Sequence, residues 1–236
     1  MRILLTNDDG YRSEGLLLLR KVLEKYGEVF TVAPERVQSG KSVSLTIRQK
    51  MPYRKLDDRY YCLDGSPADC VIFGICHVPD IDLVVSGCND GYNLGTDTLY
   101  SGTCGACIQG LIGGIPGIAF SCKSKDYFFQ IEAIAGKVFD CILKKGWLSS
   151  RGFLNVNFPE RETEKGILLT ELFVRKIRYR TEEETAGSFL SQREMETTSD
   201  IRFDVGAVRA GYVSVTPLKG DYSCAGFWTE SGEVRR

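Results

Sequence analysis

Histidine is almost absent from this sequence, and other shortages are equally informative. Of the 236 residues, His77 is the single histidine, so a Ser-His-Asp triad or a zinc site made of several histidines has little to draw on. No run of 18 apolar residues occurs, which argues against a membrane span, and the first residues lack the pattern of a signal peptide. A formal net charge of −1 gives no overall field that would favour nucleic acid or an anionic membrane. An active site in this chain is therefore expected to use oxygen ligands.

The nine cysteines are odd in number and irregularly spaced, and most lie in apolar segments. This pattern predicts reduced, buried thiols in a cytoplasmic protein. The pair Cys104 and Cys107, in "CGAC", also fits a thiol redox protein, because a thiolate near a helix start has a lowered pKa. The same small residues would equally let a helix pack closely against a sheet.

Strands and helices alternate through the first two thirds of the chain. Alternation of this kind predicts an α/β fold with right-handed crossovers and a mostly parallel sheet covered on both faces. The segment 166–204 is rich in charge and β-branched residues and is expected to form a long hairpin or extended arm. No repeat or linker divides the chain. The expected strands are 2–7, 28–33, 42–47, 59–64, 82–87, 117–122, 153–159 and 212–218, and the expected helices are 14–27, 67–77 and 126–146.

Polar, glycine-rich segments follow several of these strands and should meet at the carboxyl edge of the sheet, where open α/β folds bind ligands. The first, "NDDGYRS", places Asp8 and Asp9 side by side. Adjacent carboxylates repel each other unless a cation or hydrogen-bond donors offset the repulsion. Because Asp-Gly is also a common turn signal, this motif alone leaves an ordinary turn open.

The later segments add further oxygen ligands. "APERVQSGKSVSLT" contributes Ser39, and "VSGCNDGYNLGTDTLYSGT" contributes Asn89 and Asn93. The residues 101–103 begin a helix of small residues, whose free N–H groups favour an anion. Carboxylate, hydroxyl and amide oxygens suit Mg²⁺ or Mn²⁺ better than zinc. Together the segments predict a metal-dependent phosphoryl hydrolase.

At these residues the sequence resembles the SurE (survival protein E) family of 5′-nucleotidases. The resemblance covers residues 3–218, and it implies a Rossmann-like three-layer sandwich with a C-terminal hairpin arm that exchanges between subunits. On this basis residues 1–236 form a single SurE-like phosphatase domain, with 171–203 as an oligomerisation arm. The stretches that carry the resemblance are "ILLTNDDGYRSEG", "VAPERVQSGKSVSLT", "GSPADCV", "VSGCNDGYNLGTDTLYSGT", "NVNFP" and "GYVSVTPL".

The resemblance also implies an activity and its site. It implies a phosphomonoesterase that needs one divalent cation per subunit, Mg²⁺ or Mn²⁺, and hydrolyses nucleoside monophosphates to nucleoside and phosphate, with some members also acting on 3′-nucleotides and short polyphosphate. It implies a homodimer or homotetramer, without a stable nucleic acid partner or a membrane. The metal ligands would be Asp8, Asp9, Ser39 and Asn89, with the two aspartates catalytic, and the phosphate contacts would be Asn93, Ser101, Gly102 and Thr103.

Two other interpretations of the same loops stay open. A nucleotide-binding regulator without catalysis would use the same polar segments, and would bind nucleotide without releasing phosphate. A phosphatase that forms an aspartyl-phosphate, like the haloacid dehalogenases, would need Asp-x-Asp after the first strand, whereas Asp8 and Asp9 are adjacent.

Overall fold

A nine-stranded mixed sheet runs through the centre of the protein. The computed structural model describes residues 1–160, 165–185 and 188–220. In spatial order the strands are β3 (Tyr53–Asp57), β4 (Tyr60–Leu63), β2 (Glu28–Pro34), β1 (Arg2–Thr6), β5 (Leu83–Asp90), β6 (Gly117–Cys122), β7 (Phe153–Asn157), β11 (Val213–Leu218) and β8 (Ile167–Leu169). The six strands from β4 to β7 in this order are mutually parallel. β3 and β11 are antiparallel to their neighbours β4 and β7.

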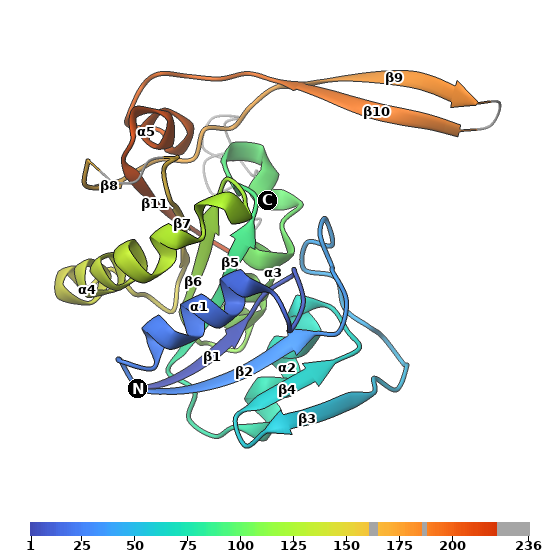
Figure 1. Ribbon diagram of the computed structural model, residues 1–236, viewed down its shortest axis with the longest axis vertical. Helices are drawn as coiled ribbons and strands as arrows, with labels where there is room; N and C mark the ends of the chain where they lie inside the picture. Colours follow the sequence, from blue (N-terminus) through green and yellow to red (C-terminus); the bar gives the residue numbers. More distant parts are fainter. Residues whose placement is uncertain (161–164, 186–187, 221–236) are drawn as a thin grey trace, which may run out of the picture.

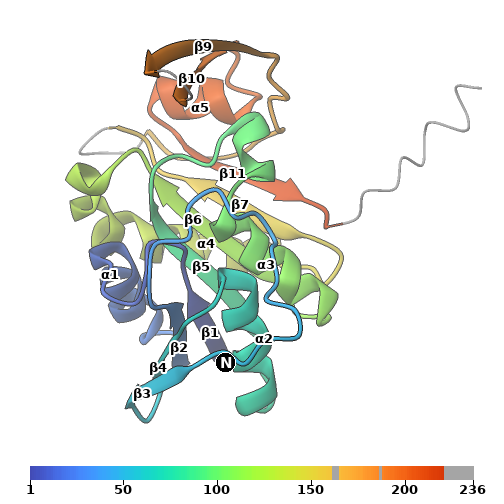
Figure 2. The ribbon, with the colours of Figure 1, turned by 90° about the vertical axis from the view of Figure 1, so that its right-hand side faces the viewer.

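Helices cover both faces of this sheet, which confirms the α/β prediction (Figures 1 and 2). The helices α1 (Glu14–Leu23) and α4 (Gly136–Lys145) lie on one face. The opposite face is covered by α2 (Pro67–His77) and α3 (Gly102–Ile112). No helix among the described residues is long and apolar enough to cross a membrane.

The two faces of the sheet produce two apolar cores, because successive strand residues point to opposite sides. Leu5 and Val85 pack with Phe139 in the core under α1 and α4. Their chain neighbours Leu4 and Val84 pack under α2 and α3. This double burial is why the central strands are continuous apolar runs rather than alternating ones.

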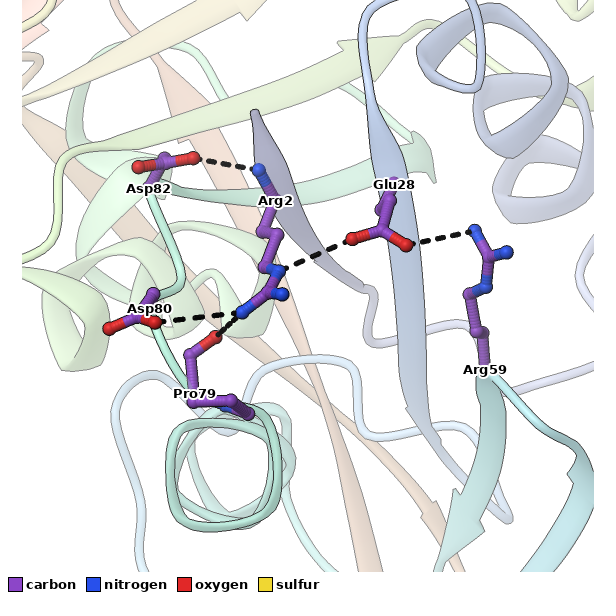
Figure 3. A network of polar contacts seen from close by, with 6 residues as sticks. All are labelled: Arg2, Glu28, Arg59, Pro79, Asp80 and Asp82. Atoms are coloured by element: carbon purple, nitrogen blue, oxygen red, sulfur yellow. Dashed lines mark hydrogen bonds and ion pairs between the residues drawn. The ribbon is translucent and has the colours of Figure 1, made fainter.

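Charged side chains fix the amino-terminal edge of the sheet, which is opposite to the edge where the polar loops gather (Figure 3). The Arg2 guanidinium lies 3.2 Å from Glu28 at the start of β2 and 3.6 Å from Asp80. The Arg2 N–H donates to the Asp82 carboxylate at 2.7 Å, and Arg59 approaches Glu28 to 3.8 Å. These contacts join the starts of β1, β2 and β5.

The segment 42–47, expected to be a strand, is a loop instead, and that prediction was wrong. Thr46 donates both its N–H and its hydroxyl to the Asp69 carboxylate, at 3.0 and 2.8 Å. The Ser66 hydroxyl donates to the Ser44 carbonyl at 2.6 Å. Side chains at the start of α2 therefore satisfy the hydrogen-bonding groups of this loop. The antiparallel partner of β4 is β3 instead.

The expected helices also differ in their ends. α1 stops at Leu23 rather than continuing to Gly27. The segment 126–146 is divided into a 3₁₀ turn, η2 (Lys125–Tyr127), a π-helical turn, η3 (Ile131–Ala135), and α4. The spacing of apolar residues could not distinguish one continuous helix from η3 followed by α4, because buried apolar residues occur in both segments, for example Ile131 in η3 and Val138 in α4.

The expected arm is a separate two-stranded antiparallel hairpin of β9 (Ile177–Thr185) and β10 (Ser188–Met195). It projects beyond the carboxyl ends of the central strands (Figure 1). A short helix that the sequence analysis did not predict, α5 (Asp204–Ala210), lies beside its base.

Candidate functional site

Asp8 follows β1 after a single intervening residue, Asn7, at the carboxyl edge of the sheet, and is only 3% exposed. The Thr103 hydroxyl donates to Asp8 Oδ1 at 2.5 Å. The Asp8 carbonyl accepts the Gln38 N–H at 2.7 Å, so the loop after β2 is held against it. The first turn of α3 contacts the carboxylate of Asp8, and the loop after β2 contacts its backbone, so both segments meet at this residue.

The start of α3 reaches Asp8 because residue 102 is a glycine. A Cβ at Gly102 would stand 2.9 Å from the Asp8 Cβ. Burial raises the pKa of Asp8, while the Thr103 hydroxyl and the N–H groups of Gly102 and Thr103 act in the opposite direction. The helix start thus offsets only part of the effect of burial, and the pKa of Asp8 stays above its ordinary value.

Asp9 accepts the Asp90 N–H at 3.0 Å, which ties it to the end of β5. Burial raises the pKa of Asp9 to about 6; the Asp90 N–H lowers it, and the nearby charges of Asp8 and Asp90 raise it further. Within residues 1–160, 165–185 and 188–220, no lysine or arginine forms an ion pair with Asp8 or Asp9. Two adjacent carboxylates therefore lack a protein cation.

Ser39 and Asn89 lie with Asp8 around one cavity of about 470 Å³. The loop that carries Ser39 is held at one side by Asp8 and at the other by Tyr100, whose carbonyl accepts the Ser42 N–H at 3.0 Å. Asn89 Nδ2 donates to the Gly91 carbonyl at 2.8 Å, which orients the amide and leaves its oxygen as the available ligand atom.

This arrangement fits a divalent cation of the hard type. It combines a hydroxyl and an amide oxygen with two carboxylates that have no counter-ion in the part of the chain that the structure describes, and this is the donor set that Mg²⁺ and Mn²⁺ prefer. Among the described residues no group of three or more His, Cys, Asp or Glu side chains could hold a metal. The candidate site therefore depends on the oxygens of Ser39 and Asn89 as well as on Asp8 and Asp9.

Two of the predicted phosphate contacts, Ser101 and Asn93, lie beside these ligands, and they differ in their hydrogen bonds. Ser101 caps α3 by accepting the Cys104 N–H at 3.0 Å, and its hydroxyl hydrogen stays available to a ligand. Asn93 is 5% exposed, and its Nδ2 donates to Ser121 Oγ at 2.7 Å. Both Ser101 and Asn93 line the cavity.

The asparagines of the motif "NVNFP" do not line the cavity but hold the backbone of Asn93, which does. The side chains of Asn155 and Asn157 donate to the Asn93 carbonyl at 2.7 and 3.1 Å, and Asn157 Oδ1 accepts the Asn93 N–H at 3.0 Å. Both side chains are fully buried. Their role is to fix the loop after β5, and only the tertiary structure reveals it.

Several cavity-lining residues were not predicted. Asp90, Asp97 and Tyr100 lie within the segment "NDGYNLGTDTLY" and could have been selected for their proximity to Asn89. Arg193 and Met195 come from β10, about 100 residues later in the chain, and carry no recognisable motif.

Cys104, Cys107 and the single histidine, His77, do not line the cavity. Cys104 and Cys107 are free, fully buried, and burial raises the pKa of both. This environment is the opposite of the one that makes a thiol reactive. His77 stacks on Phe73 at 3.8 Å between ring centroids at the end of α2, away from the cavity.

Comparison with known proteins agrees with the geometry over nearly the whole chain. The sequence profile described as "Survival protein SurE" matches residues 3–179. A 5′-nucleotidase SurE of Actinobacillus succinogenes is 39% identical over 232 residues, covering 94% of this chain and 93% of the relative. A 5′-nucleotidase SurE of Chelativorans sp. is 41% identical over 238 residues, covering 94% of each. The crystal structure of the SurE protein from Aquifex aeolicus matches with a TM-score of 0.86 at 37% identity and covers 98% of both chains. This chain belongs to the SurE family.

Proposed function

We propose that this protein is a divalent-metal-dependent 5′-nucleotidase that hydrolyses nucleoside monophosphates to nucleoside and inorganic phosphate. The observation that carries the proposal is the pair Asp8 and Asp9, which form no ion pair with a lysine or arginine of the described residues and lie with Ser39 and Asn89 at the carboxyl edge of the sheet. The activity is the one named for the SurE relatives of Actinobacillus succinogenes and Chelativorans sp..

In this proposal Asp8, Asp9, Ser39 and Asn89 hold one Mg²⁺ or Mn²⁺ ion. When bound, such an ion supplies Lewis-acid polarisation of a phosphoryl oxygen and lowers the pKa of a water molecule. Ser101, Gly102 and Thr103 receive the phosphate at the start of α3, and Asn93 closes the cavity beside them.

Asp8 is the carboxylate that we assign as the proton acceptor for the attacking water. It lines the cavity, whereas Asp9 is turned towards the Asp90 backbone. Thr103 engages Oδ1 of Asp8, so the proton would be accepted at Oδ2.

The test is release of inorganic phosphate from a panel of nucleoside 5′- and 3′-monophosphates and short polyphosphate. The protein is first treated with a chelator, and Mg²⁺ or Mn²⁺ is then restored. We expect release from 5′-nucleotides only after metal is restored, and loss of at least about 100-fold in kcat for Asp8→Asn. Nucleotide binding without phosphate release under any metal would indicate a regulator instead, and full activity of Asp8→Asn would reject the assignment.

We also propose that the hairpin β9–β10 makes the protein a homodimer or homotetramer by exchange between subunits. Its two strands pair with each other and not with the main sheet, and they project from the body of the molecule (Figures 1 and 2). Exposed strand edges of this kind favour pairing with a second chain. Size-exclusion chromatography with light scattering tests this, and a monomeric mass would contradict it.

The eight cysteines of the described residues are free, which supports a reducing compartment, the cytoplasm, as the location. We further propose that residues 1–236 act as one domain, with the hairpin as its oligomerisation arm.

A further inference from the structure

The cavity that contains the candidate metal ligands has a second, chemically different part. Asp8, Ser39 and Asn89 form its polar, acidic part. Its remaining wall includes Tyr100 and Arg193, and Arg193 is contributed by the hairpin strand β10. Neither Tyr100 nor Arg193 is among the proposed metal ligands or phosphate contacts.

Tyr100 and Arg193 form a cation–π pair, and both side chains are partly exposed. The Arg193 guanidinium carbon lies 5.8 Å from the centroid of the Tyr100 ring, and a guanidinium nitrogen lies 3.6 Å from Asp97 Oδ1. Tyr100 is 44% exposed, and the Arg193 side chain is 48% exposed. The Tyr179 side chain, on β9, lies next to the Tyr100 side chain, so both hairpin strands approach this ring.

Charge distinguishes the two kinds of group that could bind here. Asp97 neutralises Arg193 locally, so this part of the cavity has no surplus positive charge for a second phosphate. Planar guanidinium and phenol groups instead suit a flat, uncharged aromatic ligand, which stacks on them. Nucleic acid bases stack in this way on tyrosine and arginine side chains in many proteins.

The base of the hairpin is fixed to the wall of the cavity, so Arg193 has a defined position there. The turn η1 (Gly95–Leu99), which carries Asp97, is joined to the segment before β9 by Thr96. The Thr96 hydroxyl donates to the Arg175 carbonyl at 3.0 Å and accepts the Arg175 N–H at 2.9 Å.

A buried carboxylate makes a second connection. Asp204, at the start of α5, accepts the Gly95 N–H at 2.6 Å and the Phe173 N–H at 3.0 Å. Gly95 permits this approach, because a Cβ there would stand 2.3 Å from the Phe173 carbonyl oxygen.

We propose that Tyr100 and Arg193 bind the base of the nucleotide, so that the hairpin supplies a specificity-determining residue of the active site. This inference rests on the proposed function, because it places the substrate phosphate at the start of α3. Asp97 is then a positioning residue that holds Arg193 over Tyr100.

The experiment compares adenosine 5′-monophosphate with ribose 5-phosphate, which lacks the base but keeps the sugar and the phosphate. We expect Arg193→Ala and Tyr100→Ala each to lower kcat/KM for the nucleotide about tenfold, through KM, and to change that for ribose 5-phosphate less than about twofold. Tyr100→Phe keeps the ring and should retain most of the activity. Arg180→Ala is the matched control, since Arg180 is on the same hairpin, pairs with Glu194 at 3.6 Å and does not line the cavity.

An equal loss of kcat/KM on both substrates would overturn the inference. It would mean that Tyr100 and Arg193 contact the phosphate or support the fold. Unchanged kinetics with the nucleotide would also overturn it. Nucleotide binding by calorimetry, in the presence of Mn²⁺, separates failure of this inference from failure of the proposed function. If the wild-type protein releases no phosphate, the proposed function fails. Weaker nucleotide binding by Arg193→Ala would then still support the base site, and unchanged binding would reject it.

Discussion

Replacing Asp9 with asparagine should stabilise the metal-free protein while removing its activity. Burial, with the charges of Asp8 and Asp90, raises the pKa of Asp9 from 3.8 to about 6. One pKa unit corresponds to about 1.4 kcal/mol, so ionised Asp9 lowers the free energy of unfolding by up to about 3 kcal/mol above pH 6. An amide removes this cost but accepts the Asp90 N–H more weakly, so we expect a net gain of about 1–2 kcal/mol.

The pH dependence of this gain has a definite sign. Because the pKa of Asp9 is higher in the folded protein, protonated Asp9 favours folding, fully below pH 3.8, and this contribution is lost as the pH rises through about 6. The asparagine variant should therefore gain little near pH 4, about half of the full gain at pH 5 and the full gain at pH 8. A bound divalent cation stabilises the wild-type carboxylates and should reverse the order of stability.

The assay is urea unfolding in the presence of a chelator at pH 5 and pH 8, followed by circular dichroism. Asp126→Asn is the control, because Asp126 is exposed and lies outside the cavity. If Asp9→Asn is no more stable than the wild type at pH 8, or if its gain is the same at both pH values, the reasoning from burial is refuted.

Three further substitutions test the framework of the site. Gly102→Ala should lower kcat/KM about 100-fold, because the new Cβ must displace Asp8 from the start of α3; unchanged kinetics would contradict this. Asp204→Ala leaves three N–H groups, two of them buried and one partly buried, without their acceptor and should lower the free energy of unfolding by about 3 kcal/mol, measured by urea denaturation. A loss below about 1 kcal/mol would mean that water replaces the carboxylate. Phe120→Ala, in the fully buried core, should cost about 3–5 kcal/mol, and thermal unfolding would show whether the core is that tightly packed.

The local parts of the fold were predictable because their causes are local. The helix 67–77 was predicted correctly, and it begins with a capping box of Ser66 and Asp69 and with Pro67 at its first position, all within four residues of sequence. The segment 42–47 was not predictable in the same way. Its β-branched residues favour a strand. The Asp69 carboxylate, more than 20 residues away, instead accepts the N–H and the hydroxyl of Thr46 and holds the segment as a loop.

The site shows the same division. The sequence by itself determined which oxygen-bearing residues are available. Asp8, Asp9 and Ser39 follow strands and Asn89 lies at the end of one, and the carboxyl ends of these strands share one edge of the sheet. Only the tertiary structure decided that Arg193 reaches the same cavity. The position of β10 depends on Asp204 and Thr96, whose hydrogen bonds join segments about 80 to 110 residues apart. Such long-range contacts leave no periodic pattern in the sequence, because they depend on how separate elements pack and not on the conformation of any one of them.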